Sequence, residues 1–499
     1  MKQLQPESCN STLLLRGPHR LSSASIQSTR DTVNMSELNV FATTFNLATR
    51  AAALTDGELH RWLAPMWNRK DGVKADVVVI SIQEMSPLHV SMSGLSVPLV
   101  DKLSSRFLEN LNDATDSSTY YQVASESLCS IGLWVFADEQ SVPKSKLGKV
   151  VLSATGFGAG GTGNKGAVGA RVLIDRGAVE GQSQWESFTF ISTHLAAHDY
   201  AIKTRNANYQ TMLTSLIFPA TSALDVPSRV FETSHCFVLG DLNYRLSDKV
   251  RTVERRVAGS EKDQQKNPHR WDAIVEGSLS PDQGERSELF AQRKSLVEMD
   301  TLAEQRGRNQ TMLGLREGPL TSFAPTYKRL MGKVEGYHPK RRPGYTDRIL
   351  FASYDDRLEG ASNGDGDDDD DQTSLIGRRV VGRTKALVYD SIPEMIISDH
   401  KPVYSIINLP PPLSDRSTPS MGSTPYQTPR LPFPYSVQAA SDPLVLAMYN
   451  GVGRTTDRVI GFAWYSTLIL GGGKEVVGIA VEVVLLTVLL FWWNGIWPF

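Results

Sequence analysis

Residues 236–245 read Cys-Phe-Val-Leu-Gly-Asp-Leu-Asn-Tyr-Arg. The apolar run at the start predicts a short buried strand, and a glycine, a carboxylate and an amide follow where this strand ends. Two later segments carry similar groups: residues 343–348 read Pro-Gly-Tyr-Thr-Asp-Arg, and residues 398–403 read Ser-Asp-His-Lys-Pro-Val. Together they supply carboxylates, an amide, a histidine and arginines. This set suits metal-assisted attack of water on a phosphate ester and requires no cysteine or serine nucleophile.

Polar side chains also follow strand-like runs nearer the N-terminus. The runs at 39–45, 76–82 and 188–192 lead to Asn46, to Gln83 and Glu84, and to His194. A rigid sheet can hold such side chains in place while the surrounding loops vary. Helical patterns at 199–218 and 285–304 alternate with the strands. The chain therefore reads as an α/β protein with functional groups at strand ends.

These segments, taken in chain order, resemble the inositol polyphosphate 5-phosphatases of the endonuclease/exonuclease/phosphatase superfamily. The resemblance covers about residues 35–409 and includes Phe45-Asn46, Gln83-Glu84, Gly163-Asn164-Lys165-Gly166, residues 193–198, Arg205-Asn206 and residues 325–328. It implies a four-layer, DNase I-like sandwich, in which two mixed β-sheets pack together and helices flank them. The chain departs from the family at Phe45 and Tyr345, where tryptophan is usual, and at Ala167, where glycine is usual. We expect altered packing at these positions and no lost catalytic group.

The resemblance also implies roles for individual side chains. Oxygen ligands would hold Mg2+, a carboxylate and an amide would orient the attacking water, and a histidine held by a carboxylate would face the phosphate. The implied metal ligands are Glu84, Asn46 and Asp399. The implied catalytic residues are Asp241, Asn243, His400, Asp347 and His194.

A basic segment between two of the matched motifs is the predicted substrate-binding region. Residues 328–342 contain six basic residues and one acid, Glu335. Such a run is usually a solvated face, but the family uses matching positions to hold the phosphate next to the scissile one. The implied substrate contacts are Asn164, Lys165, Tyr327, Lys328, Lys340, Arg341 and Arg348. For Arg348, as for Arg245, a structural ion pair is the alternative.

The amino-acid composition bears on the number of domains, the partners and the cellular compartment. The chain of 499 residues is long for one ordinary domain, yet only one part of it reads as continuously globular. The net charge of -2 includes six aspartates within residues 364–371, so the remainder carries +4 and indicates no particular partner. The cysteines at 9, 129 and 236 lack the spacing of a disulfide framework or a metal site, which indicates a reducing compartment.

Three segments outside the resemblance are predicted to be irregular. Residues 1–34 are Ser-rich without an apolar period, which predicts a disordered N-terminal extension, and Met35 is an alternative start. Residues 361–374 form an acidic insertion that lacks the spacing of a calcium-binding loop. Residues 410–458 begin with a Pro-, Ser- and Thr-rich stretch, which predicts a flexible linker.

The hydrophobic tail, 459–499, is predicted to attach the chain to a membrane. Residues 476–493 contain one charge, Glu482, and eighteen helical residues span about 27 Å, close to the thickness of the hydrocarbon core. We therefore expect a C-terminal transmembrane helix that leaves the catalytic domain in the cytosol, in a thin membrane such as the endoplasmic reticulum. Residues 459–470 would add an interfacial or hairpin segment. A buried core helix is the alternative.

The expected activity is Mg2+-dependent removal of the 5-phosphate from phosphatidylinositol 4,5-bisphosphate at a cytosol-facing membrane. The 3,4,5-trisphosphate and soluble inositol phosphates are further candidate substrates. A sphingomyelinase or nuclease of the same superfamily is the second hypothesis, and an inactive membrane adaptor is the third. Residues 325–328 with Lys340 and Arg341 favour the phosphatase, and no extended basic surface suggests a nucleic-acid partner. The sequence leaves open which inositol substrate is preferred, whether one or two metal ions act, and whether His400 is a general acid or a stabilising charge.

Overall fold

The computed structural model describes residues 37–68, 74–114, 118–179, 182–220, 227–247, 274, 287–359, 380–412 and 443–493. The predicted N-terminal extension at 1–34 and the acidic insertion at 361–374 lie outside these ranges.

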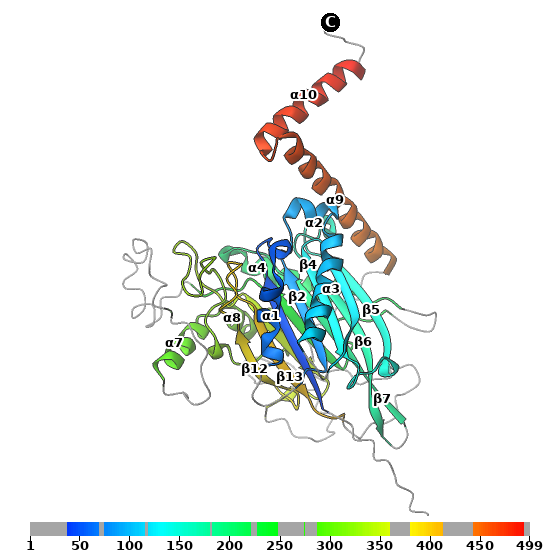
Figure 1. Cartoon of the computed structure of the whole chain (residues 1–499), viewed down its shortest axis with the longest axis vertical. Coiled ribbons are helices and arrows are strands. Elements are labelled where there is room, and N and C mark those ends of the chain that lie inside the picture. The colour runs from blue at the N-terminus through cyan, green and yellow to red at the C-terminus, as the bar shows by residue number, and fades with distance from the viewer. Residues whose placement is uncertain are drawn as a thin grey trace, which may run out of the picture. The chain divides into compact units, whose positions relative to one another are not determined.

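Two mixed β-sheets form the centre of the molecule (Figure 1). The first sheet has the strand order β12-β13-β1-β2-β4-β3 and the second has the order β5-β6-β7-β8-β9. The strands of the first sheet are β1 (Leu38–Asn46), β2 (Val77–Gln83), β3 (Tyr120–Leu128), β4 (Ile131–Asp138), β12 (Lys385–Ser391) and β13 (Val403–Leu409). Those of the second are β5 (Leu147–Gly156), β6 (Gly166–Val179), β7 (Gln182–His194), β8 (His235–Asp241) and β9 (Asp347–Ser353). A separate pair joins β10 (Arg357–Leu358) and β11 (Val380–Val381).

Helices lie outside the two sheets, and some of them cover the outer faces (Figure 1). They are α1 (Asp56–Leu63), α2 (Leu88–Ser93), α3 (Val97–Asp113), α4 (Ile202–Ser215), α7 (Glu288–Val297), α8 (Thr301–Gly307), α9 (Pro443–Leu470) and α10 (Glu475–Trp493). Helices α1 and α3 lie over the first sheet (Figure 1), and α4 and α8 contribute to the core outside the second. The predicted four-layer sandwich of helices, sheet, sheet and helices is therefore confirmed.

The alternation of side chains along β1 shows how the layers form. Val40 and Ala42 point into the core between the two sheets, whereas Phe41 and Phe45 point into the core beneath α1 and α3. Successive strand residues face opposite sides, so a strand with apolar residues in both sets of alternating positions is buried on both faces.

Aromatic rings fill the core outside the first sheet. Trp62 of α1 packs edge-on against Phe45 with ring centres 5.4 Å apart, and also against Phe107 of α3 at 5.8 Å. Phe107 in turn packs against Trp134 of β4 at 5.4 Å. Each such pair contributes about 1 kcal/mol beyond the burial of its area. Phe45 thus fills its position, where the family usually has tryptophan, as part of a continuous aromatic cluster.

One helix predicted at 285–304 is two helices. Helix α7 ends at Val297 and α8 begins at Thr301, because the intervening Asp300 has extended backbone angles and accepts hydrogen bonds from the main-chain N–H groups of Leu302 and Ala303. An aspartate at this position caps a new helix more readily than it continues an old one.

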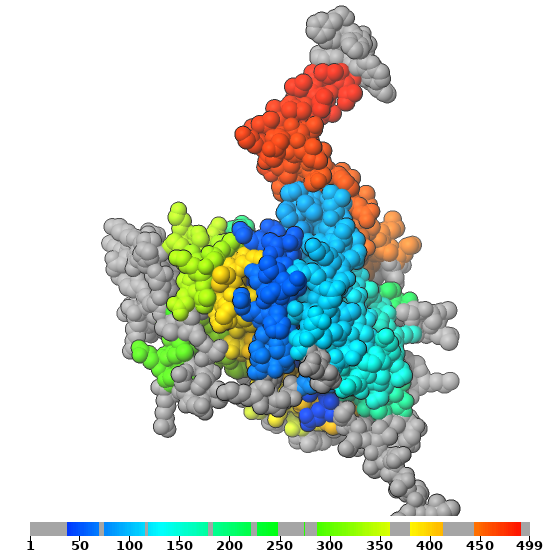
Figure 2. Space-filling view, in the orientation of Figure 1, coloured from blue at the N-terminus to red at the C-terminus, as the bar shows by residue number. Residues whose placement is uncertain are grey.

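The C-terminal region differs from its prediction. Residues 443–458, placed in a flexible linker by their sequence, belong to α9, which packs against α2 and against the short 3-10 helix η4 (Ala159–Gly161) (Figures 1 and 2). Leu446 and Asp457 of α9 are buried. The Pro-, Ser- and Thr-rich composition that suggested a linker ends before this helix begins.

The predicted transmembrane helix at 476–493 is not supported. Within the described part of the chain, every helix falls short of the length or the apolar character needed to cross a membrane. Glu482 is hydrogen-bonded within the tail, because its carboxylate accepts from the hydroxyls of Thr467 at 2.8 Å and Ser466 at 3.2 Å.

Gly240 provides a test of the strand packing at the end of β8. Its φ is +149°, and a Cβ atom there would lie 1.8 Å from the carbonyl oxygen of Thr193 in the neighbouring strand. Gly240→Ala should lower the free energy of unfolding by about 3 kcal/mol or more, because this clash is with backbone. Gly57→Ala in α1 is the control, since nothing lies within 4 Å of a Cβ there. Urea unfolding of both variants measures the difference, and equal stabilities would contradict the packing described.

Candidate active site

Strand register brings the predicted groups to one edge of the two sheets. Parallel pairing of β1 and β2 sets Asn46 opposite Gln83, which precedes Glu84. In the second sheet, parallel pairing of β7 and β8 sets His194 opposite Asp241, and antiparallel pairing sets Asp241 opposite Asp347. Side chains that are far apart in sequence therefore meet because they end neighbouring strands.

Asp241 is the centre of this group. Its Oδ2 accepts a hydrogen bond from the amide of Asn46 at 2.9 Å and lies 3.3 Å from Nε2 of His194. Burial alone would raise the pKa of Asp241, but the hydrogen bond with His194 and the charges of His400, His194 and Lys165 lower it below its usual range. The carboxylate is thus ionised at neutral pH.

Asn243 holds Oδ1, the other carboxylate oxygen of Asp241. Its main-chain N–H donates to Oδ1 of Asp241 at 3.0 Å, and its side-chain amide donates to the carbonyl of Leu195 at 3.1 Å. The residue has a positive φ of 57°, which asparagine tolerates better than most side chains. Arg245 donates to Oδ1 of Asn243 at 3.3 Å and pairs with Asp199 at 2.9 Å. This turn therefore holds Asp241 by backbone geometry.

His400 is held between two carboxylates. Its Nδ1 lies 2.9 Å from Oδ2 of Asp347, and its Nε2 lies 4.0 Å from Oδ2 of Asp241. Burial lowers the pKa of His400, but the charge and hydrogen bond of Asp347 and the charges of Asp241 and Asp399 outweigh burial and raise it to about 9. The ring is therefore a cation at neutral pH that is oriented from one side, as in a catalytic triad.

Nearby hydroxyl groups position the pair of Asp347 and His400. They were not singled out from the sequence. Thr326 and Thr346 donate to Oδ2 of Asp347 at 2.6 Å and 2.9 Å. Ser398 accepts from the main-chain N–H of His400 at 3.1 Å and donates to the carbonyl of Asn46 at 2.7 Å. Each lies one or two positions from a predicted residue within a matched motif, and that adjacency is the signal that pointed to them.

Lys165 enters the site from the loop before β6. Its Nζ lies 2.6 Å from Nε2 of His194 and 4.0 Å from Oε1 of Glu84. Burial lowers the pKa of Lys165, and the charges of Glu84 and Asp241 oppose that effect. Asn164 beside it is exposed.

The donor set around Glu84 fits a hard divalent cation. The Glu84 side chain is 42 % exposed. Asn46 ends the neighbouring strand, where its amide oxygen accepts from the main-chain N–H of Ala48 at 3.0 Å and its amide nitrogen donates to the Asp241 carboxylate at 2.9 Å. Mg2+ and Ca2+ prefer such oxygen ligands. Asp399, the third implied ligand, instead pairs with the ammonium of Lys328. Asp241, Asp347 and His400 also lie close enough together to hold a metal, but their mutual pairing accounts for that geometry.

The predicted substrate contacts are only partly brought together. The Tyr327 ring lies 4.6 Å from the His400 ring, and the Arg245 guanidinium stacks on it at 4.6 Å. Lys340 and Arg341 are exposed on the loop that follows. The pKa of His338 is lowered, first by burial and then by the charges of Lys328, Arg341 and Lys340. The main-chain N–H of His338 donates to the carbonyl of Lys328 at 2.8 Å, and its ring Nδ1 accepts from the main-chain N–H of Lys340 at 3.2 Å, so these three residues lie close together in the segment that follows Tyr327.

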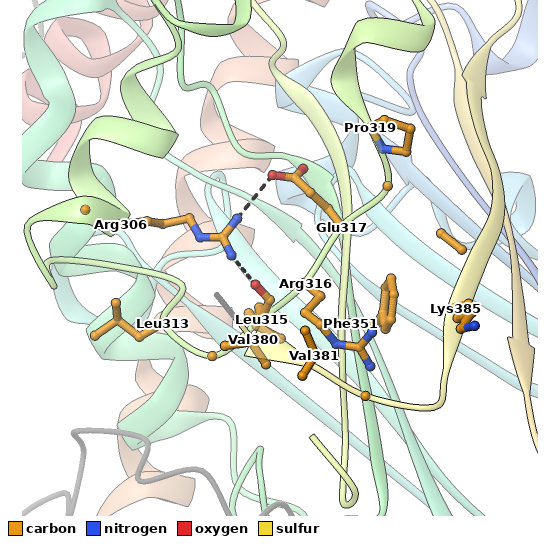
Figure 3. Close-up of a pocket in the computed structure, with 15 residues that line it drawn as sticks. Arg306, Leu313, Leu315, Arg316, Glu317, Pro319, Phe351, Val380, Val381 and Lys385 are labelled. Carbon is orange, nitrogen blue, oxygen red and sulfur yellow. Dashed lines mark hydrogen bonds and ion pairs between the residues drawn. The ribbon is translucent and has the colours of Figure 1, made fainter. Parts of the chain in front are cut away.

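Arg348 does not point into the site. It is fully buried, and its guanidinium pairs with Asp300 at 2.9 Å and with Glu317 at 2.6 Å. These carboxylates raise its pKa against the effect of burial. Its geometry matches the structural ion pair rather than the implied substrate contact. Glu317 also lines a separate pocket of about 830 Å³, bordered by Arg306, Arg316, Phe351 and Lys385 (Figure 3).

The family is established by a match over most of the chain. The model described as "Endonuclease/Exonuclease/phosphatase family 2" matches residues 43–277 and 279–406. The chain belongs to this family. Its relatives include synaptojanin of Caenorhabditis elegans, 26 % identical over 68 % of this chain and 24 % of that protein. Another is the polyphosphatidylinositol phosphatase INP53 of Saccharomyces cerevisiae, 26 % identical over 77 % of this chain and 28 % of that protein.

The chain thus spans only about a quarter of the length of these relatives. A solved structure supports the fold. It is the inositol polyphosphate 5-phosphatase domain of SPsynaptojanin in complex with inositol (1,4)-bisphosphate and calcium ion. The TM-score is 0.51 at 23 % identity, over 75 % of this chain and 84 % of that one.

The pairing of Asp347 with His400 can be tested by nuclear magnetic resonance. In the metal-free protein, the pKa of His400 should be about 9. Asp347→Asn should lower it, because burial then favours the neutral ring with less opposition. Asp113→Asn on the exposed end of α3 is the control. A His400 pKa that is the same in all three proteins would contradict the pairing.

The raised pKa of His400 makes the stability of the fold depend on pH. Since the folded pKa of about 9 lies above the usual 6.5, the His400 cation stabilises the fold fully below about pH 6.5. This contribution is lost as the pH rises through about 9. Urea unfolding between pH 6 and 9.5 should show that the free energy of unfolding falls in the wild-type protein, and that it falls less in Asp347→Asn.

Proposed function

We propose that this protein is a divalent-metal-dependent phosphatase that removes the 5-phosphate from inositol phospholipids, with phosphatidylinositol 4,5-bisphosphate as the main substrate. The observation that carries the proposal is the arrangement of His400 between Asp347 and Asp241, with Lys165 and His194 beside it. One ionised carboxylate, one imidazolium and one ammonium then surround a position where a phosphate group fits.

The side chains have distinct tasks in this proposal. Asp241, kept ionised by its neighbours, accepts a hydrogen bond from the attacking water and orients it. His400, held cationic by Asp347, donates from Nε2 to an oxygen of the phosphate. Bound Mg2+, held by Glu84 and Asn46, would neutralise charge on the phosphoryl oxygens. Lys165 adds a further positive charge on the same side.

The cations beside the site favour a second phosphate on the substrate. Lys328 lies 5.5 Å from the ring of Tyr327, which contacts the His400 ring, and the charges of Lys328, Lys340 and Arg341 all lower the pKa of His338. A compact group of cations suits a single neighbouring phosphate, whereas a nuclease would need a longer basic track. The structural relative was solved with inositol (1,4)-bisphosphate, which keeps a 4-phosphate and lacks a 5-phosphate. A curated relative is named as a phosphatase of polyphosphatidylinositol.

The proposed location is a cytosol-facing membrane, with the endoplasmic reticulum as the first compartment to examine. A lipid substrate requires access to a bilayer surface, and α10 exposes apolar side chains that include Val484, Leu486 and Leu490. Fractionation of cells that express the full chain tests this, and full recovery in the supernatant at physiological salt would overturn it.

The reaction is tested by phosphate release from the full chain with Mg2+. The substrates are phosphatidylinositol 4,5-bisphosphate, inositol 1,4,5-trisphosphate, sphingomyelin and abasic DNA, and Asp241→Asn is the blank. Release from the inositol substrates with the 4-phosphate retained supports the proposal. Cleavage of sphingomyelin or DNA alone would assign the site to a phosphodiesterase, and no reaction with any substrate would favour the inactive adaptor.

Recognition of the 4-phosphate gives a sharper prediction. The double variant Lys340→Ala, Arg341→Ala should raise KM for phosphatidylinositol 4,5-bisphosphate about tenfold or more, because hydrogen bonds to charged groups are lost. The effect on phosphatidylinositol 5-phosphate should be small, since that lipid lacks the 4-phosphate. Lys333→Ala is the matched control from the same exposed loop. Equal losses on both lipids would refute the assignment.

Lys328 is a less suitable target for this experiment. Its ammonium pairs with Asp399, so removing it would leave a carboxylate unpaired next to His400. The exposed pair avoids that complication.

A further inference from the structure

Helix α9 carries a buried carboxylate that reaches the loop before β6. Asp457 is 3 % exposed, and its Oδ2 accepts a hydrogen bond from the main-chain N–H of Gly163 at 2.8 Å. The same oxygen lies 3.5 Å from the thiol of Cys129. Burial, followed by the charge of Asp457, raises the pKa of Cys129, so this thiol stays protonated and can donate. The two contacts join α9 to residues that lie 294 and 328 positions earlier in the chain.

The helix and the loop approach each other at backbone distance. A Cβ atom on Gly453 would lie 2.2 Å from the carbonyl oxygen of Gly161, and one on Gly161 would lie 2.8 Å from the ring of Tyr449. On the next turns of α9, a Cβ on Gly461 would lie 2.2 Å from the main-chain nitrogen of Ser93 at the end of α2. Close approach at both places requires glycine, so α9 has a defined position over the loop.

This loop ends at Lys165. Residues 157–165 connect β5 to β6, and the turn is closed by hydrogen bonds from the N–H of Gly158 to the carbonyl of Thr162 at 3.0 Å and from the N–H of Phe157 to that of Lys165 at 2.7 Å. Gly163 is two positions before Lys165, whose Nζ lies 2.6 Å from His194. A contact that fixes Gly163 therefore fixes the origin of a side chain that points into the site.

Stability alone does not account for Asp457. Its Oδ1 is buried and lacks a hydrogen-bond partner among the residues that the structure describes. A buried carboxylate with one unpaired oxygen costs free energy of folding, and burial raises the pKa of Asp457. An apolar residue would fill the same space at lower cost, but it would not hold the N–H of Gly163.

We propose that Asp457 is a positioning residue of the active site: by binding the N–H of Gly163, it holds Lys165 where it contacts the phosphate of the substrate. This rests on the proposed function only in the identity of the substrate. The C-terminal helix α9 is then part of the catalytic unit. A chain cut at the end of β13 would contain every residue that contacts substrate, yet its loop would be unanchored.

The test is a double-mutant cycle in the full chain. Asp457→Ala should lower kcat/KM for phosphatidylinositol 4,5-bisphosphate about tenfold or more, since misplacing a group by 1 Å can cost about 100-fold. Lys165→Ala should have a similar or larger effect, and the double variant should be no worse than Lys165→Ala. Additive losses would overturn the proposal, because a merely structural role weakens the enzyme whether or not Lys165 is present.

Two further variants separate positioning from folding. Asp457→Asn keeps an oxygen that can accept from Gly163 and should recover most of the activity lost in Asp457→Ala. Asp101→Ala removes a carboxylate from an exposed site on α3 and should leave activity unchanged. Hydrogen exchange reports on the loop directly: the peptide containing residues 158–166 should exchange at least tenfold faster in Asp457→Ala than in Asp101→Ala. Equal exchange rates would show that Asp457 does not anchor the loop.

A binding measurement distinguishes this proposal from the proposed function. The same cycle is measured for inorganic phosphate by phosphorus nuclear magnetic resonance, which requires no turnover. If the wild-type protein leaves inositol lipids intact while the phosphate cycle is non-additive, the proposed function fails and the anchoring role stands. If the lipids are hydrolysed while both cycles are additive, the function stands and the anchoring role fails.

Discussion

Parallel pairing within each sheet is the constraint on which the site depends. Because β1 runs parallel to β2, and β7 parallel to β8, the polar residues after these strands come out at the same edge. A shift of one residue in either pair would turn each side chain of the shifted strand to the opposite face. Phe41 and Phe45 pack on one face of β1 and the smaller Val40 and Ala42 on the other, so that shift would exchange large and small side chains between two close-packed cores. The packing of the hydrophobic cores therefore fixes the strand register, and the register brings the catalytic side chains together.

Charges at this edge are arranged so that each one stabilises another. Asp347 makes His400 a cation, and that cation helps to keep Asp241 ionised. The three groups are all buried, where an unpaired charge would be costly. Threonine and serine hydroxyls from the same motifs complete the network. A site built this way is preorganised, because its dipoles and charges already point at the position that the proposed function gives to the phosphate.

The sequence predicted the sheets and the contents of the site because both depend on local signals. Short apolar runs predict strands, and a polar residue at the end of a run marks the edge where function collects. The sequence did not reveal the orientation of Arg348, since its partners Asp300 and Glu317 lie far from it along the chain. It also missed the docking of α9, which depends on glycines that allow close approach. In a sequence, glycine usually indicates a flexible segment. Only the fold shows that Gly453 and Gly461 allow α9 to pack closely against its neighbours.

The position of Asp457 has a consequence for how the protein is made. Its partner Gly163 precedes it by 294 residues, so during synthesis the loop that carries Lys165 stays unanchored until the chain has emerged past residue 457. A nascent chain, or a product of early termination, would have folded sheets and a complete set of catalytic side chains but an unanchored loop. Under the anchoring proposal, full activity would appear only after α9 has been synthesised and has reached its place on the domain.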